Sequence, residues 1–329
     1  MEFKKTLDFS WGKIIIKAAT IHPIEKQMER MRGSMIIKKI DLHAHVVPEA
    51  GYARVDGGRF VTPQQIRKMY DAWGVEKGVQ LPISSPEYEC DQLSNRDAEH
   101  LVRDFPETVG WWFCNLDPRW GYNRPDCDLS HYLRYFKEHG AKGVGEVTTN
   151  LPIDDPYMQN LFFHCEQCEM PLLFHMGRLG GGDYGMVDDL HMPQLERALQ
   201  RFPRLRFIGH SQKWWAEMSG DCTEEQRNGY PTGKVVPGGR TVELLRNYPN
   251  MYGDLSAGSG GNAVMRDPEF GYRFLEEFQD KLYFGIDICD ASNVMELSHW
   301  LDDAVEHGCI SQTAYNKVCR ENAIKLLEG

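Results

Sequence analysis

The 329-residue chain lacks any long apolar run. No stretch approaches the roughly 20 residues that a membrane-spanning helix needs, and the isoleucine run 14–16 is too short for a signal-peptide core. An excess of positive charge is also missing, because 37 basic residues stand against 48 acidic ones and the net charge is −11. Such a chain has no general electrostatic attraction to nucleic acid or to an anionic membrane, so both are excluded as partners. We expect a cytoplasmic protein that acts on a small molecule.

A regular cysteine framework is absent as well. The nine cysteines are odd in number and scattered, which argues against disulfides and is typical of a reducing compartment. Cys165 and Cys168 have the spacing of a redox motif, but they lie within a helical-looking segment, 155–169, rather than in the turn after a strand. We therefore expect thiols without a redox role.

No low-complexity linker and no internal repeat divides the chain, so we expect one barrel domain, residues 35–329. Residues 1–34 stand outside it as an N-terminal extension. Met35 is an alternative natural start, because the first predicted strand begins directly after it.

Eight short apolar runs alternate with amphipathic helical patterns, for example at 63–73, 129–139, 192–202 and 267–279. A strand followed by a helix, repeated in this way, predicts an α/β fold, the parallel (β/α)8 TIM barrel. A doubly wound open sheet is the alternative. The barrel is favoured because polar residues end many of the strands, at the edge where barrel enzymes place their chemistry. The eight runs are 36–42, 77–83, 109–115, 141–147, 171–175, 205–210, 251–255 and 282–287.

The segment Asp41-Leu42-His43-Ala44-His45 follows directly on the first apolar run. Side chains alternate between the two faces of a strand, so both imidazoles point the same way, within reach of one metal ion, and Asp41 falls on that face too. Three potential ligands in five residues suit a metal site better than a hydrophobic core. We interpret the histidines as ligands and Asp41 as a residue that orients them.

Four later runs also end in a polar residue. Glu146 lies at the end of the fourth, His175 of the fifth, His210 of the sixth and Asp287 of the eighth. The ends of barrel strands converge on one mouth, so we expect these side chains to share a pocket with the two histidines of the first strand.

This ordered set of motifs resembles the amidohydrolase superfamily. The forms Phe174-His175, Gly209-His210 and Phe284-Gly285-Ile286-Asp287 are most similar to its amidohydrolase-2 branch, which includes aminocarboxymuconate-semialdehyde decarboxylase. The closing segment 321–327 is similar to the C-terminal helix of that branch. The match runs from about residue 36 to the end of the sequence given.

The resemblance implies a divalent metal ion, commonly zinc, with manganese as the alternative. It implies His43, His45, His175 and Asp287 as ligands, and His210 as a nearby acid/base or oxygen-polarising residue. Nitrogen and carboxylate donors suit either ion. Such an ion lowers the pKa of a bound water toward 7, so Asp287 can accept its proton while His210 stabilises charge on the substrate oxygen.

Many hydrolases of the superfamily that this chain resembles place a lysine at the end of the fourth strand, where it bridges two metals. This chain has Glu146 at that position. The glutamate could itself ligate or bridge metal, or it could orient His175 or a substrate group. Both interpretations stay open, and so does the number of ions, one or two.

Arg178 and Lys213 follow the fifth and sixth strands, and we expect them to bind substrate, with Arg178 able to clamp a carboxylate.

The predicted function is hydrolysis of a small amide, ester or lactone by an activated water. The alternative is non-oxidative decarboxylation of an aromatic or unsaturated acid, which similar proteins perform with the same ligands. A barrel that binds metal without turnover is disfavoured by His210 and Asp287. Similar proteins are often homodimers.

Overall fold

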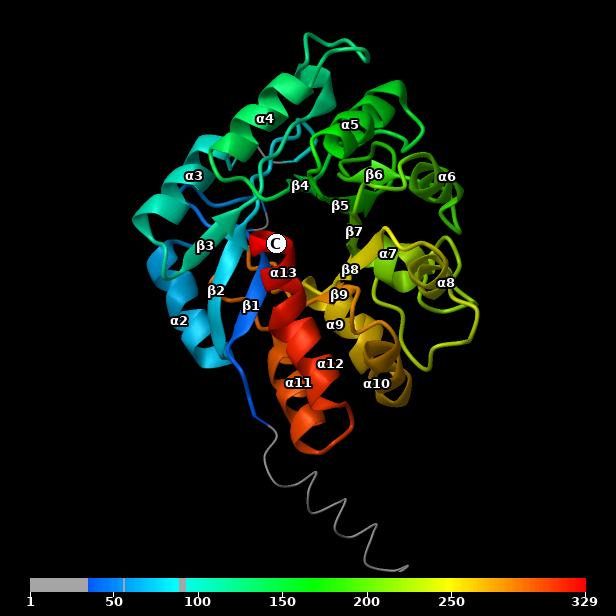
Figure 1. Cartoon of the computed structure of the whole chain (residues 1–329). Coiled ribbons are helices and arrows are strands. Elements are labelled where there is room, and N and C mark those ends of the chain that lie inside the picture. The colour runs from blue at the N-terminus through cyan, green and yellow to red at the C-terminus, as the bar shows by residue number, and fades with distance from the viewer. Residues whose placement is uncertain (1–34, 56, 89–92) are drawn as a thin grey trace, which may run out of the picture. The chain divides into compact units, whose positions relative to one another are not determined.

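The computed structural model describes residues 35–55, 57–88 and 93–329 (Figure 1). The expected N-terminal extension, residues 1–34, lies outside the described residues.

Parallel strands form two sheets. One contains β1, β2 and β3 in that order, and the other contains β4, β5, β7, β8 and β9, with β6 paired to β5. Apart from the short β6, these strands correspond to the eight predicted runs. Their bounds are β1 Lys39–Ala44, β2 Val75–Gln80, β3 Val109–Trp112, β4 Val144–Val147, β5 Leu172–Gly177, β6 Met186–Val187, β7 Phe207–His210, β8 Met251–Asp254 and β9 Leu282–Tyr283.

The two sheets meet along two seams. At one seam Cys114, just after β3, pairs in parallel with Val144 of β4; at the other, Ala44 of β1 pairs with Ile288, beyond β9. Backbone hydrogen bonds of 2.8–3.0 Å reinforce both seams. The last strand therefore returns to the first, and the chain is the predicted α/β (β/α)8 barrel rather than an open sheet.

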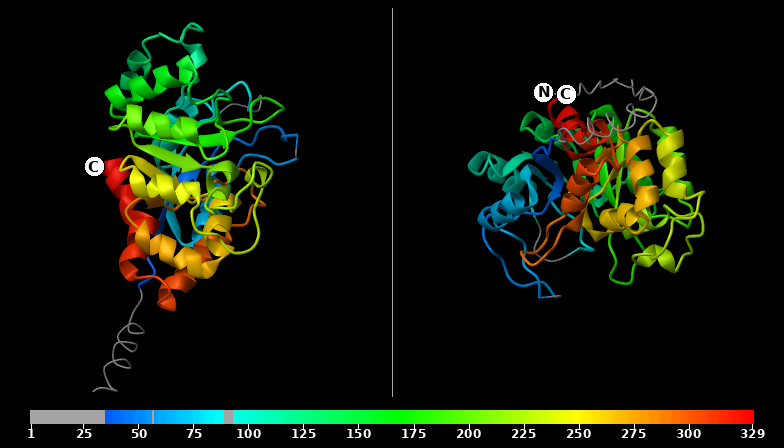
Figure 2. Two further views of the ribbon diagram at one scale, coloured as in Figure 1. Left: turned by 90° about the vertical axis from the view of Figure 1, so that its right-hand side faces the viewer. Right: turned by 90° about the horizontal axis from the view of Figure 1, so that it is seen from below.

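Helices flank the strands on the outside (Figures 1 and 2). Local sequence explains several helix starts: capping boxes at Thr62 and Ser94 begin α2 and α3, and proline occupies the first turn of α2, α5, α6 and α10. The four helices named from periodicity agree with the structure to within two residues at each end. The helices are α2 Pro63–Trp73, α3 Asn95–Asp104, α4 Ser130–Glu138, α5 Pro156–Gln167, α6 Pro193–Arg201, α7 Gln212–Ala216, α8 Arg240–Asn247, α9 Ala257–Met265, α10 Pro268–Glu277, α11 Glu296–Glu306, α12 Gln312–Asn316 and α13 Asn322–Glu328.

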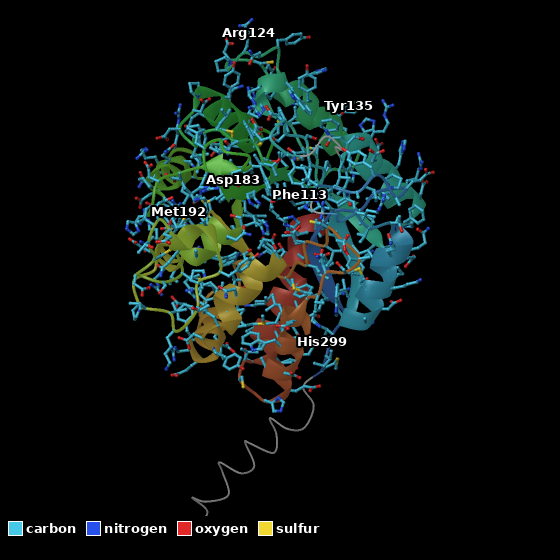
Figure 3. All side chains as sticks on the ribbon, turned by 180° about the vertical axis from the view of Figure 1, so that it is seen from behind. Phe113, Arg124, Tyr135, Asp183, Met192 and His299 are labelled. Carbon is cyan, nitrogen blue, oxygen red and sulfur yellow. The ribbon has the colours of Figure 1, made fainter. Side chains whose placement is uncertain are left out.

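An inner cluster of buried side chains fills the barrel below the polar strand ends. The C-terminal helix α13 contributes Ala323 and Leu327 to it, and so closes the end of the barrel where the strands begin. Figure 3 shows Phe113, a member of this cluster, deep within the molecule, whereas the half-exposed Tyr135 lies at its periphery. The cluster comprises Ile40, Leu42, Val79, Leu81, Trp111, Phe113, Leu173, Ile208, Tyr283, Ala323 and Leu327. The long loops that follow the strands extend on the side away from the C-terminus (Figure 2, left).

The described cysteines are free thiols, as expected. Burial raises the pKa of the Cys165 thiol in α5 well above its usual range, which argues against a redox role. Within the described ranges, no helix combines the length and apolar character needed to cross a membrane.

Candidate metal centre

Two histidines at the end of β1 bring their imidazole rings together. Nε2 of His43 lies 3.0 Å from Nε2 of His45, and both side chains are buried. The other ring nitrogens are engaged: His45 Nδ1 lies 2.9 Å from the carbonyl oxygen of Leu81, and His43 Nδ1 lies 2.7 Å from Oδ2 of Asp254. These acceptors favour a hydrogen on Nδ1, which leaves the Nε2 lone pairs available to a metal ion.

Carboxylates of Glu146 and Asp287 complete this group of donors. Glu146 Oε2 lies 3.4 Å from Nε2 of His43 and 3.3 Å from Nε2 of His45. Asp287 Oδ1 lies 3.6 and 3.4 Å from the same two nitrogens. Four donors placed about 2.1 Å from one ion at tetrahedral corners lie about 3.4 Å from one another. The two nitrogens thus lie at ligand spacing from each other and from each carboxylate, so one divalent ion could be held by both imidazoles together with Glu146, with Asp287 or with both.

The buried charges of this centre require compensation. Burial opposes a charged His43, but Asp287 and Glu146 raise the pKa of its imidazole well above the usual range. Burial and His43 likewise oppose a charged His210, yet Asp254 and Asp287 raise its pKa to about 9. The carboxylates thus hold protons on neighbouring imidazoles. A bound divalent cation would compensate the negative charge of the carboxylates in place of these protons. The imidazoles would then lose the protons and become free to bind the ion.

His210, at the end of β7, faces Asp287. Its Nε2 lies 3.4 Å from Oδ2 of Asp287, while its Nδ1 lies 3.0 Å from the Ser256 hydroxyl and 3.3 Å from Oδ2 of Asp254. The imidazole is therefore held at the edge of the donor group. Its acid/base or oxygen-polarising role stays a prediction.

The sequence prediction misses Asp254 and Ser256. Asp254 is fully buried, and its carboxylate contacts both His43 and His210 while accepting hydrogen bonds from the hydroxyl and the backbone N–H of Ser256. The signal was present, because Asp254 ends strand β8 just as the predicted residues end their strands. Ser256 lies beyond the strand, and no pattern points to it.

His175 joins the centre through Glu146. Its Nδ1 lies 2.8 Å from Oε1 of Glu146, whose other oxygen faces the two histidines of β1. Glu146 thus contacts both the donor group and His175, and the two alternative roles predicted for it stay open. The structure brings all six strand-end residues together, as expected from the barrel, and their individual roles stay predictions.

Asp41 does not lie beside the histidines, so the prediction of one shared face is wrong. Its carboxylate accepts hydrogen bonds from the Tyr70 hydroxyl of α2 over 2.7 Å and from the backbone N–H groups of His43 and Ile286 over 2.9 and 2.8 Å. The pairing of β1 with β2 shifts register within this stretch, and such a bulge breaks the strict alternation of side chains. Asp41 fixes the backbone that carries the ligands, which agrees with its predicted orienting role.

A cavity of about 170 Å³ adjoins His175 and is lined by both predicted substrate-binding residues, Arg178 and Lys213. Arg178 is 58% exposed, and its Nε lies 3.4 Å from Oδ2 of Asp183. Lys213 is buried, and burial together with the nearby Arg227 lowers the pKa of its amine. Arg227 also lines the cavity; the sequence prediction misses it because it lies in a single-turn 3-10 helix, Gln226–Asn228, within the long connection between α7 and α8.

Comparison with known proteins is consistent with this architecture. A family model described as amidohydrolase matches residues 40–329. A solved structure described as amidohydrolase II has 14% identity and a TM-score of 0.56, covering 89% of this chain and 100% of that one. An apo structure from Agrobacterium tumefaciens has 12% identity and a TM-score of 0.55, covering 90% and 97%. At such identities the solved structures show the fold alone.

A further solved structure, with 14% identity and a TM-score of 0.49, is the 5-carboxyvanillate decarboxylase of Novosphingobium aromaticivorans in complex with manganese and a nitrobenzoic acid; the alignment covers 89% of this chain and 96% of that one. Among curated proteins no match is found.

Proposed function

This chain belongs to the amidohydrolase family, and from that premise we propose that it is a metal-dependent hydrolase of a small amide, ester or lactone. The observation that supports the proposal most is the spacing of the four donors from His43, His45, Glu146 and Asp287, which suits a single divalent ion. Zinc is the proposed ion and manganese the alternative, because both accept imidazole and carboxylate donors.

When bound, the ion would lower the pKa of a water molecule toward neutrality and polarise a carbonyl oxygen. Asp287 is the proposed acceptor of the water's proton. One of its oxygens, Oδ1, faces the imidazoles of β1, whereas Oδ2 is turned toward His210 at 3.4 Å. A carboxylate in this position has one oxygen for the ion and one within reach of a reacting proton.

His210 is the proposed hydrogen-bond donor to the substrate's carbonyl oxygen. Its Nδ1 is held by Ser256 and Asp254, so its Nε2 is directed toward the donor group. A hydrogen bond from Nε2 would stabilise the negative charge that develops as water attacks the carbonyl carbon. A positioned donor of this kind is worth about 3 kcal/mol in acyl transfer.

The cavity beside His175 is the proposed binding place for an anionic or strongly polar part of the substrate. The planar guanidinium of Arg178 can bind a carboxylate through two parallel hydrogen bonds. The amine of Lys213 is buried, so an anion placed against it would restore part of the solvation it has lost. Arg227 lies in the same wall, but its guanidinium is already paired with Glu217 at 2.7 Å and Glu224 at 3.0 Å.

The same cavity favours a second candidate function, non-oxidative decarboxylation of an aromatic or unsaturated acid. Its cations could bind the carboxylate of such a substrate, and Asp287 or His210 could deliver the proton that replaces carbon dioxide on carbon. This alternative needs no net consumption of water, and that difference separates the two reactions experimentally.

The test assays metal-loaded protein against a panel of amides, esters and lactones, and in parallel against hydroxybenzoates and muconate-like acids. We expect cleavage of a member of the first panel with uptake of one water and no carbon dioxide. Asp287→Asn, which preserves size, should lower turnover by about 10²–10⁴-fold at matched metal content. Carbon dioxide release from the second panel alone would replace the proposal with decarboxylation, and full activity of Asp287→Asn would exclude the proposed proton acceptor.

A further inference from the structure

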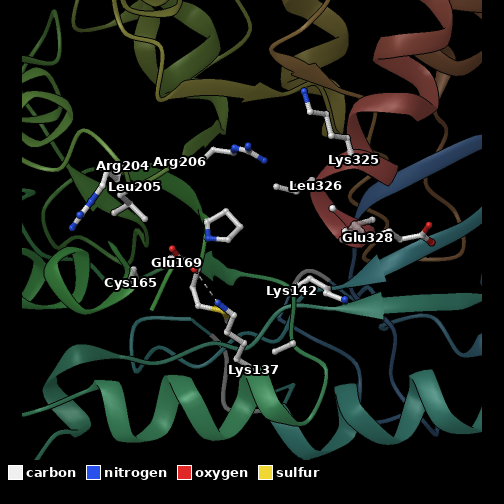
Figure 4. A pocket seen from close by; sticks show the side chains of 15 residues that line it. Lys137, Lys142, Cys165, Glu169, Arg204, Leu205, Arg206, Lys325, Leu326 and Glu328 are labelled. Carbon is white, nitrogen blue, oxygen red and sulfur yellow. Dashed lines mark ion pairs between the residues drawn. The ribbon is translucent and has the colours of Figure 1, made fainter. Parts of the chain in front are cut away.

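A second cavity, of about 530 Å³, lies at the end of the barrel opposite the metal centre. Its walls include the residues that immediately precede strands β4, β5 and β7 and the C-terminal helix α13 (Figure 4). The metal centre, in contrast, is built from the ends of these strands. A cavity of this volume is large enough for a small organic molecule.

Basic residues outnumber acidic ones in the walls of this cavity, although the chain as a whole has a net charge of −11. Figure 4 shows their side chains on several sides of the space, contributed by different elements. The basic residues are Lys137, Lys142, Arg204, Arg206 and Lys325, and the acidic ones are Glu169 and Glu328.

Only part of this positive charge is compensated. Nζ of Lys137 lies 4.0 Å from the carboxylate of Glu169, and Nη2 of Arg204 lies 3.3 Å from that of Glu166. Arg206 is instead packed against the ring of Tyr252, with its guanidinium carbon 4.9 Å from the ring centroid. Among the described residues, three of the cavity's cations have no carboxylate within 4.0 Å: Lys142, Arg206 and Lys325.

Uncompensated cations on several walls of one concave space attract a multiply charged anion more strongly than the same cations spread over a surface. Lysine and arginine are the usual phosphate-binding side chains, the first as a point charge and the second as a fork. Apolar side chains, among them those of Pro171, Leu205 and Leu326, also line the cavity and suit the organic part of such a ligand.

We propose that this cavity binds a small phosphate-bearing molecule. The ligand is not the substrate, because the cavity is lined by residues that precede β4, β5 and β7, whereas the metal centre is built from residues at the other ends of these strands. Bound there, the ligand would connect the starts of β4 and β7, through Lys142 and Arg206, to α13 through Lys325. It would therefore stabilise the packing of α13 against the barrel.

Calorimetric titration of the metal-loaded protein with inorganic pyrophosphate, and separately with ATP, tests the proposal. We expect saturable binding of at least one probe, weakened as salt is raised because the contacts are ionic, and a higher thermal unfolding midpoint in its presence. Equal affinity for both probes would mean that phosphates alone are recognised. Tighter binding of ATP would mean that the apolar wall contributes.

The double variant Lys142→Gln/Lys325→Gln should weaken binding at least tenfold, whereas Lys142→Arg/Lys325→Arg, which keeps the charges, should bind within about threefold of the original chain. Lys68→Gln, an exposed lysine of α2 outside the cavity, is the matched control and should have no effect. Asp287→Asn alters the metal centre and leaves the residues of the cavity unchanged. It therefore shows whether a probe binds in the cavity or at the metal centre. The proposal is overturned if neither probe binds up to millimolar concentration, or if Asp287→Asn abolishes binding while the double glutamine variant retains it.

Discussion

Oδ2 of Asp254 lies 2.7 Å from Nδ1 of His43, and both side chains are completely buried. This contact fixes the rotation of the imidazole and directs its Nε2 toward the other donors. A carboxylate behind a ligand histidine also increases the basicity of that ligand.

Asp254→Asn should therefore weaken metal binding by about 10–100-fold, because the amide keeps the shape of the side chain but not its charge. Competition with a chromophoric chelator measures the dissociation constant. Asp126→Asn, which alters an exposed aspartate paired with Arg124, is the control and should bind metal normally. An Asp254→Asn protein that binds metal as tightly as the original would show that the contact does not tune the site.

Substitutions at Glu146 and His175 distinguish a ligand from a residue that supports one. We expect Glu146→Gln to lower metal affinity by more than about 100-fold, beyond the range typical of supporting partners. His175→Asn should cause a comparable loss if His175 is a ligand, as predicted, and a smaller one if it acts through Glu146. Elemental analysis should give one ion per chain. Two ions per chain would support a bridging Glu146, which contacts both the β1 imidazoles and His175.

Tyr70→Phe should lower the free energy of unfolding by about 1–3 kcal/mol, because Asp41 loses a buried hydrogen-bond donor at 2.7 Å. Urea unfolding measures the difference. The control is Tyr132→Phe in α4; in the described part of the chain the hydroxyl of Tyr132 makes no hydrogen bond, and we expect a change below about 0.5 kcal/mol. Equal effects of the two substitutions would mean that the Tyr70 hydroxyl contributes nothing specific.

The ion pair of Glu87 with Arg119 should stabilise the protein in a pH-dependent way. Burial alone would raise the pKa of Glu87, but Arg119 and the Ser85 hydroxyl lower it from 4.5 to about 2. A carboxyl whose pKa is depressed by folding stabilises the folded state above its unfolded pKa, and this contribution disappears as the pH falls from 4.5 toward 2. At neutral pH it amounts to about 1–2 kcal/mol, because solvent screens part of the interaction of this partly exposed pair.

Glu87→Gln should accordingly destabilise the protein at pH 7, and the difference from the original chain should shrink as the pH falls below about 4.5. Urea unfolding of both proteins at pH 7, 5 and 4 measures this trend. Glu306→Gln, at an exposed position of α11, controls for a general loss of negative charge. A difference independent of pH would exclude the ion pair as its source.

Much of this architecture can be predicted from sequence because it depends on repeating local patterns. The alternation of strands and helices predicts the barrel, and polar residues at the ends of β4, β5, β7 and β9 converge because a barrel brings those ends together. The bulge after Asp41 is not readable, since it depends on how β1 pairs with β2. Arg227 is equally hidden, because the long connection between α7 and α8 has no periodic pattern, and its position depends on tertiary packing.

The hydrogen bond from the backbone N–H of Ile286 to Asp41 joins residues 245 positions apart in the sequence. His43 and Asp287 are neighbours only across this closure, so a nascent chain cannot assemble the full donor set until its final strand has left the ribosome. Before that moment His43, His45 and Glu146 can supply only three of the four donors. Completion of the donor set is therefore a late event in the synthesis of the chain, because Asp287 lies beyond β9.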